Sequence, residues 1–361
     1  MNRTSNQKYK LLIMRYLPIL RYLKHKHIQS KIDRDYSFYK FKKYSRQTIS
    51  LADIPSGVDI GITSYCNINC RMCRTHFKKH SSHMDEKTFT DCITQVKRIA
   101  KSVSFHTTGE PTVHPLLSSF VSIAHKNDIR VAISTNAQRP DTLKSLYENH
   151  RYINGFRFSV DGIQDVYEYI RDGAKWEKVA TSCEWIHRVN KGRRMSNIAL
   201  TVDCILTKDN IHQISSYMDF FSQYTYPKDI SFNIANSLSA DTSYFHESRF
   251  NGIYESGIPC SQPFRTMVFE PDGTGHLCCR DYDDALNIGD ASKDILSAWE
   301  SKRARDIRDL HINGKIPICN RCLIPKAGVS ENINRLIHAL WREGAGDLEI
   351  KYRILGYIKG L

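Results

Sequence analysis

The sequence predicts an α/β fold in which a partial (β/α)6 barrel of TIM-like topology is followed by a small cysteine-rich domain. Short β-branched runs alternate with longer segments of helical period between residues 58 and 234, a pattern typical of βαβ units around a parallel sheet. Five cysteines then fall within residues 260–322. The length of 361 residues suits two domains with an appendage.

Six runs predict the strands of the barrel, and five segments predict the helices between them. The strand candidates are Val58–Thr63, Ser102–Thr107, Arg130–Ser134, Gly155–Val160, Ile198–Leu206 and Asp229–Ile234. The helix candidates are Asp85–Ala100, Pro115–Asn127, Pro140–Asn149, Trp176–Val189 and Ile211–Gln223. Six parallel strands fall short of the eight that close a full barrel, so we predict an open barrel with its chemistry at the C-terminal ends of the strands.

The second region differs in character from the first. From residue 257 it has short runs punctuated by turns such as Pro271-Asp272-Gly273, and one helix signal at Ser292–Asp309. Such a turn-rich segment is more easily held by a metal than by its own core. We expect a basic arm at residues 1–50, the barrel at 51–250, the cysteine-rich domain at 251–328 and a helical tail at 329–361.

The positive charge of the chain is concentrated near its N-terminus. Residues 1–50 hold thirteen lysines and arginines against two aspartates, which accounts for most of the formal net charge of +14. A basic field confined to one arm indicates a local contact, so no nucleic-acid partner is expected for the body of the protein. The stretch from Tyr9 to His27 has the pattern of a basic amphipathic helix kinked at Pro18. It predicts peripheral contact with an anionic membrane, docking on the protein's own domain, or a merely solvated arm.

The cysteine count predicts a reducing compartment. There are eleven cysteines, and the apolar stretch Leu11–Leu23 is interrupted by arginines, lacks a secretory cleavage site and is too short to span a bilayer. We therefore expect a cytoplasmic protein, or one at the inner face of the membrane if the arm binds lipid. Clustered cysteines in that compartment indicate metal ligands. The isolated Cys92, Cys183 and Cys204 are expected to be buried small hydrophobes.

The first cysteine cluster follows the first predicted strand as Cys66-Asn-Ile-Asn-Cys70-Arg-Met-Cys73. Three thiolates at C-x3-C-x2-C spacing can bind three irons of one [4Fe–4S] cluster and leave the fourth iron without a protein ligand. An open metal position distinguishes a reactive site from a closed structural one. A zinc site completed by His76 or His80 is the alternative.

With this motif at the end of strand one, the sequence resembles the radical S-adenosylmethionine (radical SAM) enzymes over residues 55–325. The resemblance implies that the open iron chelates SAM and that electron transfer from the reduced cluster releases a 5′-deoxyadenosyl radical. That radical abstracts a hydrogen atom from an unactivated C–H bond, while the protein orients the reactants and excludes water. An external electron donor such as a flavodoxin or ferredoxin is also implied.

Further resemblance lies at the tip of the second predicted strand. Thr108-Gly109-Glu110-Pro111 is similar to the family's Gly-Gly-Glu motif, in which a carboxylate and a backbone carbonyl receive the ammonium of SAM. The resemblance thus assigns Gly109 and Glu110 to cofactor binding. Thr108 stands where the family has its first glycine. The alternative for Glu110 is an ordinary loop carboxylate.

Three more positions resemble cofactor-binding residues at the next strand tips. Ser134 and Asn136 end strand three, and Ser159 ends strand four, where the family reaches the ribose and carboxylate of SAM. Arg171 is expected to form a fork onto that carboxylate, and Met72 is expected to pack against adenine. As alternatives, serine and asparagine at strand ends are common turn residues and helix caps, and Arg171 is a surface charge.

The second cluster comprises Cys260, Cys278, Cys319 and Cys322. It resembles the shortened SPASM or twitch domain of many radical SAM enzymes, which implies one auxiliary [4Fe–4S] cluster. Four thiolates would close that cluster, so it would conduct electrons or support the fold without binding substrate. A structural zinc ribbon with four cysteine ligands is the alternative.

Cys279 is a spare thiol beside Cys278. If this segment is a strand, neighbouring side chains point to opposite faces, so Cys279 would face away from the cluster and pack. The sharper hypothesis makes Cys279 a catalytic residue that returns a hydrogen atom to a substrate radical, as an epimerase requires.

Together these features predict a radical SAM oxidoreductase. With one auxiliary cluster as electron acceptor, the favoured reaction is two-electron oxidation of an alcohol carbon in a sugar or polyol. A radical SAM epimerase or peptide-modifying enzyme with Cys279 as donor is the first alternative, so the substrate is expected to be a small molecule, a sugar or a peptide. A non-catalytic zinc protein whose basic arm binds nucleic acid or a partner is the second.

Overall fold

The computed structural model describes residues 55, 57–73, 82–150, 153–191, 198–235, 243–256, 260–326 and 328–360. The basic arm at residues 1–50 lies outside these ranges, so its contact with a membrane or with the body stays a prediction. His76 and His80, the alternative zinc ligands, also lie outside them.

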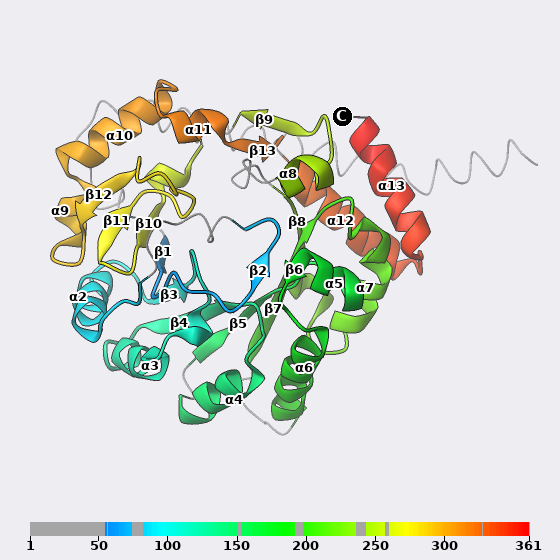
Figure 1. The fold of residues 1–361 in the computed structure, drawn as a ribbon, viewed down its shortest axis with the longest axis horizontal. Coiled ribbons are helices and arrows are strands. Elements are labelled where there is room, and N and C mark those ends of the chain that lie inside the picture. Colours follow the sequence, from blue (N-terminus) through cyan, green and yellow to red (C-terminus); the bar gives the residue numbers. More distant parts are fainter. Residues whose placement is uncertain are drawn as a thin grey trace, which may run out of the picture.

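Six parallel strands form the barrel sheet in the order β1-β3-β4-β5-β7-β8. They are β1 (Gly57–Ile60), β3 (Ser102–Phe105), β4 (Arg130–Thr135), β5 (Ile153–Ser159), β7 (Ala199–Leu206) and β8 (Ile230–Ile234). Each coincides with one of the six predicted runs. The sheet is curved and carries helices on its outer face (Figure 1), so the predicted partial barrel is confirmed.

Five helices on the outer face correspond to the predicted ones. They are α2 (Glu86–Val96), α3 (Leu117–Lys126), α4 (Pro140–Asn149), α6 (Trp176–Lys191) and α7 (Ile214–Phe221). The first of them starts at Asp85, whose carboxylate accepts from the Thr88 N–H at 2.7 Å. A short turn, η4 (Ile211–Gln213), precedes α7, and α5 (Gln164–Ile170) is additional to the predicted helices.

The core of the barrel lies between the sheet and these helices. Val58 and Ile60 of β1 face the helices and are 4% and 0% exposed. Phe89 of α2 stacks on Phe120 of α3 with ring centroids 4.1 Å apart, and Phe105 of β3 meets Phe89 edge to face. Burial of this apolar surface, at roughly 25 cal/mol per Å², holds the helices in place. The inner face of the strands is thereby left to polar side chains.

The cysteine-rich domain continues the barrel sheet, which the sequence patterns did not predict. β10 (Thr266–Phe269) pairs in parallel with β1, and β11 (Thr274–His276) and β12 (Asn287–Asp290) follow antiparallel. One sheet of nine strands therefore runs through both domains. The turn between β10 and β11 falls at Pro271-Asp272-Gly273, where Gly273 has a φ of +84° that favours glycine. The pairing fixes the loop after β11 against the barrel.

The single helix predicted over Ser292–Asp309 is wrong, because two helices occupy this segment. α9 (Ile295–Trp299) ends before Ser301, whose hydroxyl accepts from the Ala304 N–H at 3.0 Å and starts α10 (Lys302–Ile312). The next helix, α11 (Pro317–Arg321), carries Cys319.

Shorter elements complete the chain. Two small sheets pair β2 (Asn69–Cys70) with β6 (Arg171–Asp172) and β9 (Tyr254–Ser256) with β13 (Leu323–Pro325). The others are α8 (Ser243–Ser248), η3 (Pro111–Val113), η5 (Pro227–Asp229) and η7 (Gln262–Phe264).

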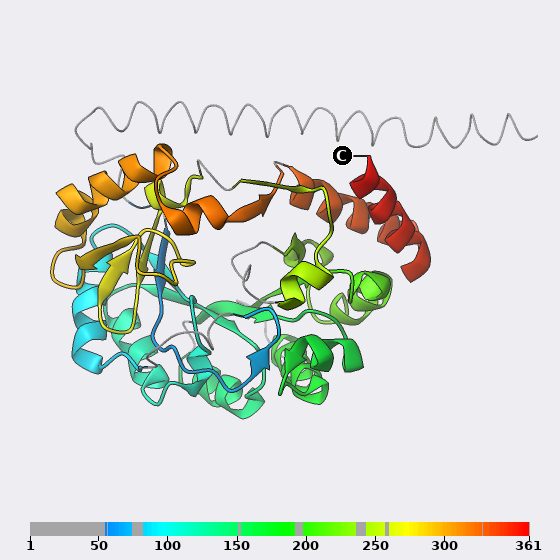
Figure 2. The same ribbon diagram turned by 45° about the horizontal axis from the view of Figure 1, so that its top comes forward.

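The tail forms α12 (Val329–Arg342) and α13 (Asp347–Lys359), as its helical spacing predicts. α12 covers β8, where the Asn334 side chain accepts from the Phe232 N–H at 2.9 Å and His338 contacts the Ile230 carbonyl at 3.0 Å. Figures 1 and 2 show the tail on the opposite side of the barrel from the β10–β12 hairpins. Within the described ranges, no helix is both long and apolar enough to cross a membrane.

Candidate functional site

Cys66, Cys70 and Cys73 line one cavity at the C-terminal end of the barrel strands. They lie on the loop after β1, where Cys70 pairs with Arg171 through β2 and β6 and the Cys73 N–H donates to the Cys70 carbonyl at 3.0 Å. Six predicted cofactor residues line the same cavity, namely Gly109, Glu110, Ser134, Asn136, Ser159 and Arg171. We call it the three-cysteine cavity. Met72 is half-buried and is not among its lining residues.

Glu110 is buried in the wall of this cavity with four hydrogen bonds to its carboxylate. One oxygen accepts from the Thr112 N–H at 3.0 Å and from the Thr112 and Thr135 hydroxyls at 2.7 Å each, and the other accepts from the Asn136 N–H at 2.7 Å. Burial raises the pKa of the Glu110 carboxyl, and these donors oppose the shift. The carboxylate thereby joins the tips of β3 and β4.

Gly109 occupies a backbone position that only glycine fits. Its φ is +77°, and an added Cβ would lie 2.5 Å from the Thr63 carbonyl and 2.6 Å from the Tyr65 carbonyl. The buried hydroxyls of Thr107 and Thr108 beside it have no hydrogen-bond partner within the described part of the chain. The second glycine of the Gly-Gly-Glu motif is therefore required here, as Gly109, for a steric reason. The backbone accommodates Thr108 at the position of the first glycine.

The guanidinium of Arg171 pairs with Asp161, whereas the sequence predicted that it binds the carboxylate of SAM. Its Nε and Nη2 lie 2.8 Å and 2.7 Å from one Asp161 oxygen, and its Nη1 reaches the Cys70 Sγ at 3.8 Å. Asp161 is 0% exposed, and its other oxygen accepts from the Ile205 N–H at 2.7 Å. Burial raises the pKa of Cys70 to about 12, and the charge of Arg171 opposes that shift. The sequence analysis did not single out Asp161, whose role depends on this long-range contact.

Asn136 connects the strand tip to the cysteine loop. Its Nδ2 lies 2.8 Å from the Asn67 side-chain oxygen and 3.9 Å from the Cys66 Sγ. Burial raises the pKa of the Cys66 thiol. Two nitrogen donors, from Asn136 and Arg171, thus approach sulfur atoms of the loop.

Cys260, Cys278, Cys319 and Cys322 line a second, mostly apolar cavity in the β10–β12 domain. Its other lining residues are Pro263, Arg280, Leu286, His311 and Ile318. Burial raises the pKa of Cys260 to about 11 and of Cys319 to about 12. We call this the four-cysteine cavity.

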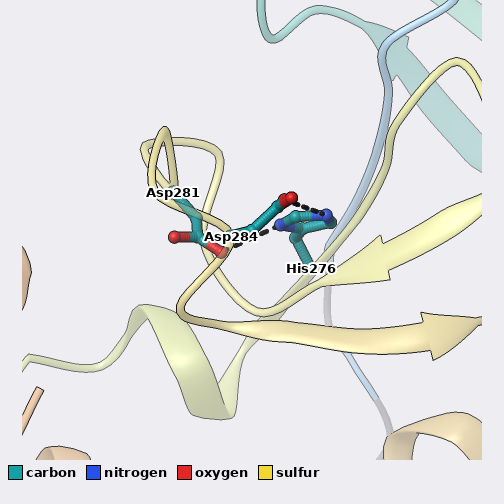
Figure 3. Close-up of side chains that lie close together, drawn as sticks. All are labelled: His276, Asp281 and Asp284. Carbon is teal, nitrogen blue, oxygen red and sulfur yellow. Dashed lines mark hydrogen bonds and ion pairs between the residues drawn. The ribbon is translucent and has the colours of Figure 1, made fainter.

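Two histidines missed by the sequence analysis support the four-cysteine cavity. His276 Nδ1 lies 2.9 Å from an oxygen of the buried Asp281, while the exposed Asp284 is 3.5 Å from Nε2 (Figure 3). Asp281 also accepts from the N–H groups of Ala285 and Leu286, at 2.9 Å and 2.7 Å. These bonds brace the loop that carries Cys278. His311 in turn accepts from the Cys260 N–H at 3.0 Å.

Cys278 and Cys279 lie beyond the end of β11 at His276. The strand geometry considered for Cys279 is therefore wrong, although Cys279 is not among the residues that line the four-cysteine cavity. The two thiols are within hydrogen-bonding reach of each other, and this bond lowers the pKa of Cys279. Arg280 and Asp59 of β1 also act on it electrostatically.

The three isolated cysteines are buried, as expected for small hydrophobes. Cys92 and Cys183 are 0% exposed, and Cys204 is 2% exposed.

Two family models match the chain in the segments that hold the two cavities. The Radical SAM superfamily model matches residues 60–218, and the SPASM model, an iron-sulfur cluster-binding domain, matches residues 260–323. Residues 60–218 therefore form a Radical SAM domain. The second domain of the chain is a SPASM domain.

A curated relative matches part of this chain at low identity. The tungsten-containing aldehyde ferredoxin oxidoreductase cofactor-modifying protein of Pyrococcus furiosus is 28% identical over 163 residues, which cover 42% of this chain and 44% of that protein. The match thus spans less than half the length of this curated relative.

Solved structures share the fold at low identity. BtrN in complex with AdoMet and 2-DOIA has a TM-score of 0.51 and 18% identity, covering 74% of this chain and 93% of BtrN. Streptococcus suis SuiB bound to precursor peptide SuiA has a TM-score of 0.54 and 16% identity, covering 70% and 66%. Native anSMEcpe with bound AdoMet has a TM-score of 0.51 and 17% identity, covering 71% and 84%.

The family implies a SAM-binding [4Fe–4S] cluster, SAM itself and an auxiliary cluster, and the donor sets fit these groups. Three cysteines on one wall, facing polar strand tips, suit a cluster with one open iron. Four cysteines around an apolar cavity suit a closed cluster. The matches to the Radical SAM model and to the iron-sulfur cluster-binding SPASM model favour iron–sulfur clusters over the zinc alternatives.

Proposed function

We propose that this protein is a radical SAM oxidoreductase that oxidises an alcohol carbon of a sugar or polyol-type substrate. The observation that carries the proposal is the placement of the two cysteine cavities on one continuous sheet, through the pairing of β1 with β10. When bound, SAM and the two clusters supply a hydrogen-abstracting radical and an electron acceptor. The residues of the chain hold these groups and keep water from the reaction.

We assign the first cluster to Cys66, Cys70 and Cys73. Glu110 and the backbone at Gly109 face the ammonium of SAM, and Ser134, Asn136 and Ser159 lie at the strand tips where its ribose and carboxylate belong. The cavity that these residues share supports the assignment. Arg171 acts as a positioning residue, because its guanidinium is held by Asp161 and its free nitrogen approaches Cys70.

We assign the auxiliary cluster to Cys260, Cys278, Cys319 and Cys322. With four thiolates, this cluster has no iron open to substrate. Its expected roles are therefore electron transfer and support of the domain. A one-electron donor of the flavodoxin or ferredoxin class would supply the first cluster.

A second candidate is epimerisation or peptide modification with Cys279 as hydrogen donor. The supporting observation is that the Cys279 thiol lies outside the four-cysteine cavity and is influenced by Asp59 of the barrel. SuiB is described with a precursor peptide and BtrN with 2-DOIA, so the shared fold accommodates more than one ligand.

Product analysis separates the two candidates. Holoenzyme with SAM and reductant is incubated in D2O with a pool of polyols and a pool of peptides. Oxidation predicts a ketone, no deuterium on carbon, and the same product from Cys279→Ala. Incorporation of deuterium at an inverted carbon, lost in Cys279→Ala, would instead support the epimerase and overturn the oxidoreductase.

A further inference from the structure

Three charged side chains lie on the inner face of the barrel sheet, the face turned away from the outer helices. Each stands between two buried apolar residues of its strand, so alternation turns it to the inner face. The three are Asp59 between Val58 and Ile60 of β1, Arg157 between Phe156 and Phe158 of β5, and Asp203 between Val202 and Cys204 of β7. We call this set the lumen wall.

The lumen wall adjoins the three-cysteine cavity. Arg157 is the register partner of Ser134, and Asp203 is the register partner of Ser159. Both serines line that cavity. Asp59 lies on β1, opposite Val268 of β10, and acts electrostatically on Cys279 in the cluster loop. The wall therefore extends from the cofactor side of the barrel toward the SPASM domain.

Arg157 and Asp203 form a solvent-accessible ion pair on this inner face of the sheet. Arg157 Nε lies 3.4 Å from an Asp203 oxygen, and the two side chains are 58% and 27% exposed. A guanidinium beside a carboxylate offers several donors next to acceptors. Neighbouring hydroxyl groups, each both donor and acceptor, are the ligand chemistry that this pair matches.

Asp59 is half-buried, yet its carboxylate forms no hydrogen bond or ion pair with any described residue. Burial raises its pKa to about 6, and Arg157 across the lumen opposes the shift. β1 and β5 are separated by β3 and β4 in the sheet, so the charge of Arg157 acts on Asp59 across the inner side of the curved sheet. The other charged or titratable groups around it are Asp203, His106, Arg280 and Cys279. Within the described part of the chain, the Asp59 carboxylate therefore has no partner through which it would hold the fold.

We propose that the lumen wall binds a polyhydroxylated substrate, with the Arg157–Asp203 pair holding neighbouring hydroxyls and Asp59 accepting the proton of the hydroxyl that is oxidised. This inference rests on the proposed function. With SAM and the clusters bound, the 5′-deoxyadenosyl radical would take the hydrogen atom of the carbon and the auxiliary cluster would take one electron. The O–H bond breaks, its proton moves to an Asp59 carboxylate oxygen, and a carbonyl forms. Solvent then removes the proton from Asp59.

Binding is tested first, without turnover. Oxidised holoenzyme with SAM is examined by saturation-transfer NMR with myo-inositol, glucosamine, cyclohexanol and the tripeptide Gly-Ser-Ala as probes. We expect the two polyols to bind and the other two to bind far more weakly. Arg157→Gln and Asp203→Asn should weaken polyol binding by about tenfold or more, the effect of losing a charged hydrogen bond. Arg98→Gln, which breaks a surface pair with Asp294 at 3.5 Å, is the matched control.

Binding of the tripeptide alone, binding of no polyol, or polyol binding unchanged in the Arg157 and Asp203 variants would overturn the inference. These outcomes do not depend on catalysis, so they are distinct from failure of the proposed function, which is a wild type that oxidises no polyol.

Turnover then tests Asp59. Asp59→Asn should bind the polyols as the wild type does and still form 5′-deoxyadenosine, but ketone formation should fall by about 100-fold, as for loss of a general base. In the wild type the rate of ketone formation should rise with pH through about 6, because the Asp59 side chain loses its proton in this range. The Asp59→Asn variant should not show this rise. Asp91→Asn on the surface of α2 is the control. Ketone formed by Asp59→Asn at the wild-type rate would overturn the inference, whereas a wild type that cleaves SAM but oxidises no polyol would overturn the proposed function.

Discussion

Arg171 shows how one buried ion pair supports the first cysteine loop. Asp161 takes two guanidinium nitrogens, and the third approaches the Cys70 sulfur. A fixed positive charge beside a thiol favours the thiolate that binds iron. The resemblance directed Arg171 toward the cofactor carboxylate instead, because a sequence pattern identifies a residue at a site without showing which countercharge holds it.

Asp161→Asn should lower the free energy of unfolding by about 3 kcal/mol, because Arg171 is left buried without a countercharge. Iron uptake by the first cluster should fall as well. Thermal unfolding and iron analysis measure the two effects. Asp306→Asn, which breaks the exposed pair with Lys302, should change the free energy by less than about 1 kcal/mol. A variant as stable and as well loaded as the wild type would contradict the role of Asp161.

Gly109→Ala should abolish SAM binding, because its Cβ would lie 2.5 Å from the Thr63 carbonyl at a φ of +77°. Gly252→Ala is a matched control, since Gly252 has a φ of +81° and nothing lies within 4 Å of an added Cβ. The strain common to both substitutions is about 1 kcal/mol, and the difference between them isolates the clash. Equilibrium dialysis with labelled SAM measures binding. Equal affinity in the two variants would refute the steric account of the motif.

At the scale of elements, the loop after β11 depends on Asp281. Asp281→Ala removes the acceptor of His276 and of two backbone N–H groups, so the loop carrying Cys278 should loosen. We expect loss of about four irons per chain, the content of one [4Fe–4S] cluster, with the first cluster retained. Asp284 is the exposed carboxylate on the other side of His276 (Figure 3). Asp284→Ala is therefore the matched control and should leave the iron content unchanged. Iron analysis that finds both clusters intact in Asp281→Ala would exclude this role.

Both cysteine loops should load better at higher pH. Burial raises the pKa of Cys260 to about 11 and the pKa values of Cys70 and Cys319 to about 12, so these thiols are protonated at neutral pH when no metal is bound. Iron binds thiolate, and loading releases protons. Iron uptake during anaerobic reconstitution should therefore increase between about pH 7 and pH 9. Uptake that stays constant or falls over this range would argue against buried thiol ligands.

The regular elements could be predicted because their signals are local. Short β-branched runs identified all six barrel strands, and helical periodicity identified five helices. The break between α9 and α10 depends on one cap at Ser301, which a continuous helical pattern conceals. The orientation suggested for Cys279 assumed a strand at Cys278-Cys279, whereas β11 ends two residues before Cys278.

At the scale of the whole molecule, the pairing of β1 with β10 could not be predicted, because it joins residues about 200 positions apart and neither strand carries a register signal. It has the largest consequence for the site, since it places Asp59 between the barrel and the cluster loop. The spacing of the first three cysteines and the resemblance of the second region to SPASM domains, by contrast, predicted which thiols share each cavity. Ligands of one cluster must converge whatever path the chain takes.

The most direct test of the account is reductive cleavage of SAM by anaerobically reconstituted full-length protein. The account predicts about eight irons per chain, absorption at roughly 400 nm, and 5′-deoxyadenosine from the wild type. Cys70→Ala should form none, while Cys319→Ala should lose only the auxiliary cluster and still cleave SAM. A colourless wild type with bound zinc, or a loaded and reduced wild type that forms no 5′-deoxyadenosine, would contradict the account.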